Sequence, residues 1–185
     1  MNSKEWIATA DRCVMNTYAR IPVVLVRGKG ARLWDMDGKE YLDFLAGISV
    51  CGLGHCHPAV TAAIARQAEN LMHVSNIYHI EPQIRLARML TERSFADRAF
   101  FCNSGAEANE AAIKLARRYS NEKTGGKRFE IISMTDSFHG RTLATVAATG
   151  QKRIQQGYDP LPAGFRHVPF NDAPALEAAI SDETC

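Results

Sequence analysis

The spacing of hydrophobic residues changes along the first part of the chain. Residues 3–17 have the period of a short amphipathic helix, and from Pro22 onward apolar and polar residues follow the pattern of strands. The expected strands are Val23–Arg27, Ala31–Asp35 and Tyr41–Phe44, and the glycines between them are typical of tight turns. This part is therefore predicted to form one helix followed by a three-stranded meander.

The remainder of the chain alternates helical and strand-like patterns. The expected elements, in order, are helices beginning at Pro58 and Pro82, a short buried strand at Ala99–Cys102, a helix at about Glu107–Tyr119, a strand at Phe129–Met134, a helical segment at Thr142–Ala148, a proline-rich loop at Pro160–Pro169 and a helix at Pro174–Ile180. Strands separated by helices indicate an α/β fold with a parallel sheet and crossover helices. Because only two or three strands are present, we expect the sheet to be incomplete. A weakly marked boundary separates an N-terminal segment, residues 1–75, from the start of a larger domain, residues 76–185.

The helix expected at about Glu107–Tyr119 has two different sides. Its apolar stripe consists of Ala108, Ala111, Ala112, Leu115 and Tyr119. On the other side, Glu110 and Lys114 have the i,i+4 spacing of a surface ion pair.

The composition is that of an ordinary folded domain. Hydrophobic residues make up 46% and charged residues 23% of the chain, which excludes a disordered protein. The formal charge of +2 is too small to indicate a nucleic acid or an anionic membrane as partner. No apolar run approaches the roughly 18 residues of a membrane span, and the N-terminus lacks the apolar core of a secretory signal. Five cysteines without CxxC pairing fit reduced thiols, so a cytoplasmic location is expected.

The turn before the helix at Glu107 is the most informative stretch. A strand pattern runs into Ser104, Gly105 and Ala106, and the helix pattern begins at once. The first turn of a helix has unpaired N–H groups and the positive end of the macrodipole, so it attracts a phosphate. Gly105 allows the backbone to approach an anion closely, and the Ser104 hydroxyl can add a donor. The alternative is that Asn103 or Ser104 only caps the helix.

A second turn of this kind follows the strand expected at Phe129–Met134. Parallel strands deliver such turns to the same edge of the sheet, where ligands collect. Phe138 could stack on a planar aromatic cofactor, and Arg141 could bind a carboxylate with its two-pronged set of donors. The plainer alternatives are a core phenylalanine and a surface arginine. His139 could act as a general base, although a role in packing the loop is favoured.

Two other segments resemble sites but carry weaker signals. Cys51, His55, Cys56 and His57 are potential metal ligands, yet consecutive residues converge poorly on one ion and no second ligand pair exists. We therefore predict no metal site and no nucleophilic cysteine there. The segment 28–30, Gly-Lys-Gly, completes no phosphate-loop motif and is interpreted as a turn.

Taken in order, the two turns resemble motifs of one enzyme family. The sequences NSGAEANEAAIKLAR and SFHGRTLATVAATGQ are similar to the phosphate-cup and ring-stacking motifs of the class III, fold-type-I aminotransferases. Upstream, GKGARLWDMDGKEYLDFLAGISV and LGHCHP resemble the N-terminal segment of the same family. The resemblance implies the pyridoxal-phosphate (PLP)-dependent transferase fold of type I, with its N-terminal helix and meander and only the first strands and helices of the large domain.

The resemblance also implies a cofactor and its contacts. Pyridoxal 5'-phosphate is the expected cofactor, with its phosphate held by the backbone N–H groups of Gly105 and Ala106 and with Ser104 adjacent. Phe138 is expected to lie against the pyridine ring. Arg141 is expected to bind the carboxylate of the substrate.

Within the family, the sequences of these motifs are most similar to those of the members that act on acetylornithine and succinylornithine. Ornithine-specific members carry a tyrosine where this chain has Ile48, and an apolar residue suits a longer, acylated substrate. Tyr18 matches a tyrosine of the substrate pocket. The implied reaction passes the δ-amino group of N2-acetyl-L-ornithine to 2-oxoglutarate, which becomes glutamate, in arginine biosynthesis. Succinylornithine, ornithine and GABA stay open as alternative amino donors, and the implied assembly is a homodimer.

One departure from the family pattern affects the expected activity. The Schiff-base lysine, the aspartate that pairs with the pyridine nitrogen and a second substrate arginine lie further downstream in complete members. None of the seven lysines here stands in a matching context. We therefore expect this polypeptide to be inactive by itself, and a non-catalytic truncated fragment is an alternative interpretation.

Overall fold

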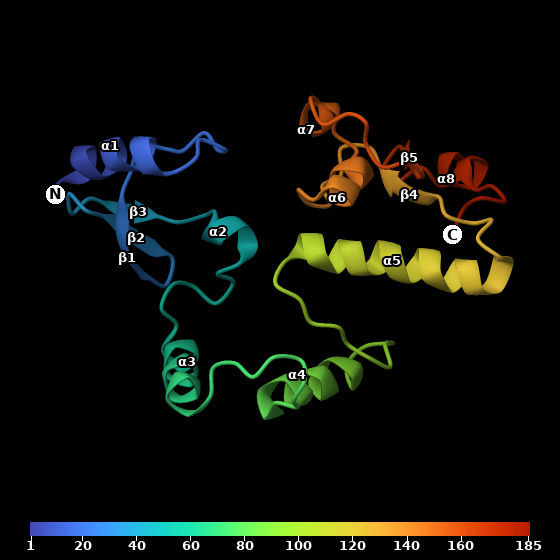
Figure 1. Cartoon of the computed structure of the whole chain (residues 1–185). Helices are drawn as coiled ribbons and strands as arrows, with labels where there is room; N and C mark the ends of the chain where they lie inside the picture. The colour runs from blue at the N-terminus through green and yellow to red at the C-terminus, as the bar shows by residue number, and fades with distance from the viewer. The chain divides into compact units, whose positions relative to one another are not determined.

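A computed structural model describes all residues from Met1 to Cys185. Residues that are close in space form two compact units, Met1–Ile80 and Glu81–Cys185. In Figure 1 the first unit is coloured from blue to green and the second from green to red. No helix of the chain combines the length and the apolar character that a membrane span requires.

The first unit contains the predicted meander. Its strands β1 (Leu25–Lys29), β2 (Arg32–Asp35) and β3 (Glu40–Leu42) pair antiparallel in that order, so the prediction is confirmed with small shifts of the ends. The segment Gly-Lys-Gly is not the turn itself, because Gly28 and Lys29 are paired within the hairpin. A Cβ on Gly28 would stand 2.7 Å from the Cβ of His55, so this strand position has room only for glycine.

Buried polar groups close the turn between β2 and β3. The carboxylate of Asp35 accepts hydrogen bonds from the Tyr41 hydroxyl at 2.7 Å and from the backbone N–H groups of Lys39 and Asp37 at 2.8 and 3.0 Å. The bond from Tyr41, followed by those from the two amides, lowers the pKa of Asp35 against the opposing effect of its burial. Side-chain hydrogen bonding thus fixes the register of a meander that has little apolar core.

The helices of the first unit are α1 (Ser3–Cys13), the short α2 (Ala46–Ser49) and α3 (Pro58–Asn70). Helix α3 begins at Pro58 as predicted, with the proline in the first turn where it blocks no internal hydrogen bond. Helix α1 ends at Cys13 instead of residue 17, because Val14 is already extended. None of these three helices has a buried residue.

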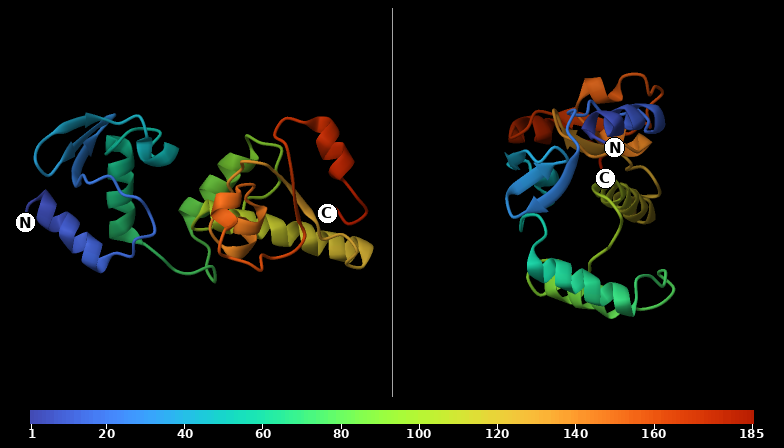
Figure 2. Two further views of the ribbon diagram at one scale, coloured as in Figure 1. Left: turned by 90° about the horizontal axis from the view of Figure 1, so that it is seen from above. Right: turned by 90° about the vertical axis from the view of Figure 1, so that its left-hand side faces the viewer.

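The second unit is built on a parallel pair of strands. β4 (Ile131–Met134) pairs with β5 (Phe165–Val168), and α6 (Leu143–Ala148) and α7 (Lys152–Gln155) lie between them in the chain. Helix α6 contacts both strands and also α5 (Gly105–Thr124), as Figures 1 and 2 show. The predicted parallel sheet with crossover helices is therefore confirmed.

The core of the second unit lies at α6. This helix places three apolar residues, Val146, Ala147 and Ala148, in the interior with relative exposures of 3% or less. The hydroxyl groups of the two threonines beside them, Thr145 and Thr149, are fully buried and hydrogen-bonded. The other two helices of this unit are α4 (Glu81–Thr91) and α8 (Ala173–Ala179).

Two sequence predictions about strands are wrong. No strand forms at Ala99–Cys102, where Phe100 is 71% exposed, because no other strand lies beside it to exchange backbone hydrogen bonds. Conversely, β5 lies within the expected loop Pro160–Pro169. The prolines of that loop flank the strand, so all four residues of β5 keep the N–H groups that a parallel ladder needs.

The apolar stripe of α5 is not its most buried face. Ile113 and Ser120 are buried, whereas Leu115 and Tyr119 of the predicted stripe are 71% and 63% exposed. Glu110 makes no ion pair with Lys114 and instead accepts a hydrogen bond from the hydroxyl of Thr142, 32 residues further along the chain. Alanines occur on both sides of the helix, so hydrophobicity distinguishes the two faces weakly and tertiary contacts choose between them.

Candidate functional site

The N-terminus of α5 is capped by the side chain of Ser104. Its hydroxyl accepts a hydrogen bond from the Glu107 N–H at 3.2 Å, so the cap that the sequence suggested at Ser104 is present. The Glu107 carboxylate in turn accepts from the Asn103 backbone N–H at 2.6 Å and from its side-chain amide at 3.0 Å. These bonds, the backbone one first, hold the pKa of Glu107 below its usual value, so the carboxylate stays ionised in this turn.

Capping leaves two amide donors of the same turn free. The N–H groups of Gly105 and Ala106 donate to no acceptor in the chain, since the intrahelical ladder begins with Ala108 donating to the Ser104 carbonyl. A Cβ built on Gly105 would meet no atom within 4 Å, so space is open beside the backbone there. Free amides, the positive end of a 20-residue helix and open space fit an anion such as a phosphate.

The loop that follows β4 is held by hydrogen bonds to the segment after α6. Asp136, which has a left-handed φ of 62°, donates its N–H to the Gly150 carbonyl at 2.9 Å. The His139 N–H donates to the hydroxyl of the fully buried Thr149 at 3.0 Å. The backbone of this loop is therefore anchored to the core of the second unit.

The structure brings this loop against the N-terminal turn of α5. Gly140 has a φ of 136°, and a Cβ there would stand 2.7 Å from the Cβ of Ala106 and 2.7 Å from the Thr145 hydroxyl. The side-chain amide of Asn109, one turn into α5, donates to the His139 carbonyl at 2.7 Å. The two turns that the sequence singled out therefore lie side by side, with glycine at the point of closest approach.

Phe138 and Arg141 stand on the exposed part of this loop. The Phe138 side chain is 57% exposed and belongs to no core. The guanidinium carbon of Arg141 lies 5.6 Å from the centroid of the Phe138 ring, which is within cation–π range. Arg141 forms no ion pair with a carboxylate of the chain, so its donors are available to a ligand.

An open hollow borders the carboxyl ends of β4 and β5. It has a volume of about 600 Å³ and is lined by residues 134–137 together with Pro169 and Phe170. Ligands of open α/β sheets bind at this edge, where the loops that follow parallel strands meet.

His139 takes part in packing the loop. Burial is the main cause that lowers its pKa, and the charge of the nearby His167 is the second. The His167 ring contacts the Ala148 carbonyl at 3.2 Å and the His139 ring contacts the Ser137 hydroxyl at 3.4 Å. A neutral His139 imidazole beside Ser137 and His167 is consistent with the packing role that was favoured from the sequence.

The other two predicted substrate residues belong to the first unit. Tyr18 is 63% exposed. Ile48 is 80% exposed and has a left-handed φ of 59° within α2, which is uncommon for a β-branched residue. Asp43 supports this turn by accepting from the Leu45 and Ala46 amides. The roles of Tyr18 and Ile48 in binding stay predictions.

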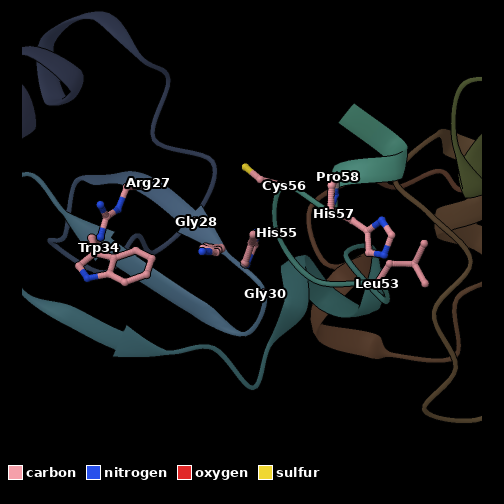
Figure 3. A pocket seen from close by; sticks show the side chains of 10 residues that line it. Arg27, Gly28, Gly30, Trp34, Leu53, His55, Cys56, His57 and Pro58 are labelled. Carbon is pink, nitrogen blue, oxygen red and sulfur yellow. The ribbon is translucent and has the colours of Figure 1, made fainter. Parts of the chain in front are cut away.

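The segment Cys51–His57 lies beside a second hollow, shown in Figure 3, of about 830 Å³ in the first unit. The His55 ring is hydrogen-bonded to the Asp43 carboxylate at 2.6 Å, and the His55 backbone forms hydrogen bonds with the Gly30 backbone. No three His, Cys, Asp or Glu side chains of the chain gather where one ion could bind them. Arg27 stacks on Trp34 at 3.8 Å on the opposite wall of this hollow.

Comparison with known proteins identifies the family of the chain. The sequence model of the family "Aminotransferase class-III" matches residues 13–185. The chain belongs to the class III aminotransferases. Its resemblance to that family, stated above from the two motifs, is thereby confirmed, as is the fold class.

Relatives of this class III aminotransferase chain share more than half of its residues. The acetylornithine aminotransferase of Methanocaldococcus jannaschii is 57% identical over 184 residues, which are 100% of this chain and 46% of that protein. The acetylornithine aminotransferase of Caldanaerobacter subterraneus is 57% identical over 179 residues, 97% of this chain and 46% of that protein. The chain thus spans about half the length of these curated relatives.

Solved structures of the family have the same fold. A Toxoplasma gondii ornithine aminotransferase, whose active site holds pyridoxal phosphate at partial occupancy, superposes with a TM-score of 0.91 at 35% identity. The match covers 96% of this chain and 42% of that one. The helix, meander and parallel strands described above are therefore the corresponding part of a class III aminotransferase.

Three residues at the contact between the two turns were missed by the sequence analysis. Asn109, Glu110 and Thr142 connect α5 to the loop, yet each has an ordinary explanation as a surface residue of a helix or as a cap. Spacing gives no signal for them, because their partners are 30 and 32 residues away.

Proposed function

We propose that this chain forms the phosphate-binding and ring-binding part of an aminotransferase that moves the δ-amino group of N2-acetyl-L-ornithine to 2-oxoglutarate. The single observation that carries the proposal is the convergence of the Gly105 and Ala106 amides with the Phe138–Arg141 turn. The acetylornithine substrate is supported by two relatives of that name at 57% identity.

Pyridoxal 5'-phosphate is the proposed cofactor, and the residues present fit it. The free amides of Gly105 and Ala106 would hold its phosphate, with Ser104 fixing the helix turn that presents them. The exposed face of Phe138 would lie against its ring. When bound, the cofactor supplies the electron sink on which transamination depends. The lysine that links to this cofactor in the family has no counterpart in the chain.

Three residues are proposed to contact the substrate. Arg141 would bind the carboxylate of the amino-acid substrate through two parallel N–H donors. Ile48 would offer an apolar surface to the acyl part of the substrate, and Tyr18 is a second proposed substrate residue of the first unit. An exposed arginine beside an aromatic ring is compatible with this use, because neither side chain is engaged in the core.

We also propose that the protein is a cytoplasmic homodimer that acts in arginine biosynthesis, without nucleic-acid or membrane partners. The small net charge of +2 supports the proposal that nucleic acids and membranes are not partners, and the five cysteines without a disulfide support the cytoplasmic location. The homodimer and the role in arginine biosynthesis are proposed from the resemblance to the family.

The test uses the full natural chain that carries these residues, with added pyridoxal phosphate. Glutamate formed from 2-oxoglutarate is measured with N2-acetylornithine, N2-succinylornithine, ornithine and GABA as amino donors. We expect the highest kcat/KM with an acylated ornithine, and acetylornithine above succinylornithine. A preference for ornithine or GABA would contradict the assignment of Ile48, and no glutamate from any donor would contradict the proposed reaction.

A further inference from the structure

A small set of contacts joins α5 to the loop after β4, away from the atoms that would touch a ligand. We define the α5–loop clamp as the side chains of Asn109, Glu110 and Thr142 with the backbone of His139. We propose that Asn109 and Glu110 are positioning residues that fix Phe138 and Arg141 relative to the free amides of α5. This inference rests on the proposed function of those amides and of Phe138.

Asn109 makes the first contact of the clamp. Its side-chain amide donates to the carbonyl of His139 at 2.7 Å, and both residues are half-buried. His139 directly follows Phe138, and its N–H is already committed to the buried Thr149 hydroxyl. Because the backbone N–H and carbonyl of His139 are both hydrogen-bonded, the backbone next to Phe138 has little freedom to rotate.

Glu110 makes the second contact. Its carboxylate accepts from the hydroxyl of Thr142, which directly follows Arg141. Thr142 is also the N-cap of α6, where it exchanges side-chain hydrogen bonds with Thr145. The clamp therefore holds the loop on both sides of the Phe138–Arg141 segment and connects it to the most buried helix of the unit.

The face of α5 that carries the clamp is continuous with the anion site. Ala106, Asn109, Glu110 and Ile113 have i, i+3, i+4 and i+7 spacing, so they lie on one side of the helix. Ala106 offers one of the free amides and contacts Gly140 by its side chain, while the next turn provides the clamp. A displacement of the clamp would change the distance between the amides and the Phe138 ring, and it would leave the amides themselves in place.

This separation permits a sharp experiment on the full natural chain. The variants are Asn109→Leu, which is similar in size and uncharged but cannot donate to the His139 carbonyl, and Glu110→Ala, which removes the acceptor for Thr142. Glu110→Gln, which retains a side-chain oxygen acceptor, serves as the conservative rescue. Lys114→Ala, one turn further along the exposed side of the same helix, is the matched control. The three measured quantities are the Kd of pyridoxal phosphate, the inhibition constant of inorganic phosphate as its competitor and the visible circular dichroism of bound pyridoxal phosphate.

Asn109→Leu and Glu110→Ala are expected to raise the Kd of pyridoxal phosphate about tenfold, because each leaves a polar group of the loop without its hydrogen-bond partner. Inorganic phosphate needs only the amides, so its inhibition constant is expected to stay within about twofold of wild type. The circular dichroism of bound pyridoxal phosphate in the visible region is expected to weaken in both variants. Glu110→Gln and Lys114→Ala are expected to match wild type.

Each other outcome has a distinct meaning. Equal losses for pyridoxal phosphate and inorganic phosphate would overturn the inference, because a general loss of structure would then account for the effect. Wild-type affinity and dichroism in both clamp variants would also overturn it, and the proposed function would survive. If the wild-type protein itself failed to bind pyridoxal phosphate, the proposed function would fail first.

Discussion

The two units of the chain are stabilised in different ways. The second unit, Glu81–Cys185, has an apolar interior formed by Ile113, the residues of α6 and β5 residue Val168. The first unit, Met1–Ile80, has no buried apolar residue, and the one residue of this unit that is buried as a whole is Asp35. Hydrogen bonds of the meander and of Asp35 and Asp43 maintain its shape. The turns that form the candidate anion site therefore belong to the unit that can hold them rigidly.

This difference bears on function because binding sites need precise geometry. Loops anchored to a packed core keep their position, as the Asp136–Gly150 and His139–Thr149 bonds do here. The exposed apolar residues of the first unit, such as Phe44 at 92% and Val50 at 82%, contribute little to its stability. Four predictions are ordered from the largest expected effect to the smallest; the first two compare the units directly, and the other two each probe one unit.

The largest effect is expected from removing the same side chain in one helix of each unit. Ile113→Ala in α5 is expected to lower the free energy of unfolding by about 2–4 kcal/mol, since Ile113 is 8% exposed. Ile64→Ala in α3 is expected to change it by less than about 0.5 kcal/mol, since Ile64 is 64% exposed. Urea unfolding followed by far-ultraviolet circular dichroism measures both. Similar losses in the two variants would refute the contrast between the units.

A second pair compares glycines. Gly140→Ala is expected to lower the free energy of unfolding by about 2–3 kcal/mol. The new methyl group would overlap Ala106, and the backbone has a positive φ of 136°. Gly52→Ala, in the first unit, is expected to change stability by less than about 1 kcal/mol, because a Cβ there meets no atom within 4 Å. Thermal and urea unfolding provide the comparison, and a neutral Gly140→Ala would show that the two turns are not in close contact.

A third pair probes the anion site at the first position of α5. Gly105→Pro removes one amide donor while proline suits the first turn of a helix, and the extended Ser104 before it is compatible with a following proline. Because a hydrogen bond to a charged group is lost, the Kd of pyridoxal phosphate is expected to rise about tenfold or more. Gly105→Ala keeps the N–H and is expected to bind within about threefold of wild type. Fluorescence titration measures both, and equal affinity in all three proteins would exclude the Gly105 amide as a phosphate donor.

The smallest effect concerns the acid stability of the first unit. The hydrogen bond from His55 is the main cause that lowers the pKa of Asp43, so its contribution is present above the unfolded-state pKa and is lost as pH falls through the folded-state pKa. Asp43→Asn is therefore expected to lose less stability than wild type as pH falls from about 5 to below about 3. Both tryptophans, Trp6 and Trp34, lie in this unit, so their fluorescence follows its unfolding. Asp11→Asn, at an exposed position of α1, is the control, and a wild-type acid profile in Asp43→Asn would contradict the prediction.

The sequence alone was sufficient for features that depend on neighbouring residues. The meander, the start of α3 at Pro58, the cap at Ser104 and the strand–helix order of the second unit follow from local periodicity and from glycine and proline. The family was also evident from the two motifs of consecutive residues. Local patterns failed at Ala99–Cys102, because a strand exists only where another strand pairs with it.

Only the tertiary structure decided which face of α5 is buried and how the two turns meet. The contacts of Gly140 with Ala106, Asn109 with His139 and Glu110 with Thr142 join residues 30 or more positions apart. Their existence depends on the path of the chain through β4 and α6, and a periodic pattern contains no information about that path. The amino-acid sequence thus specified which groups could bind a phosphate and a ring, and the packing of α6 determined that they lie together.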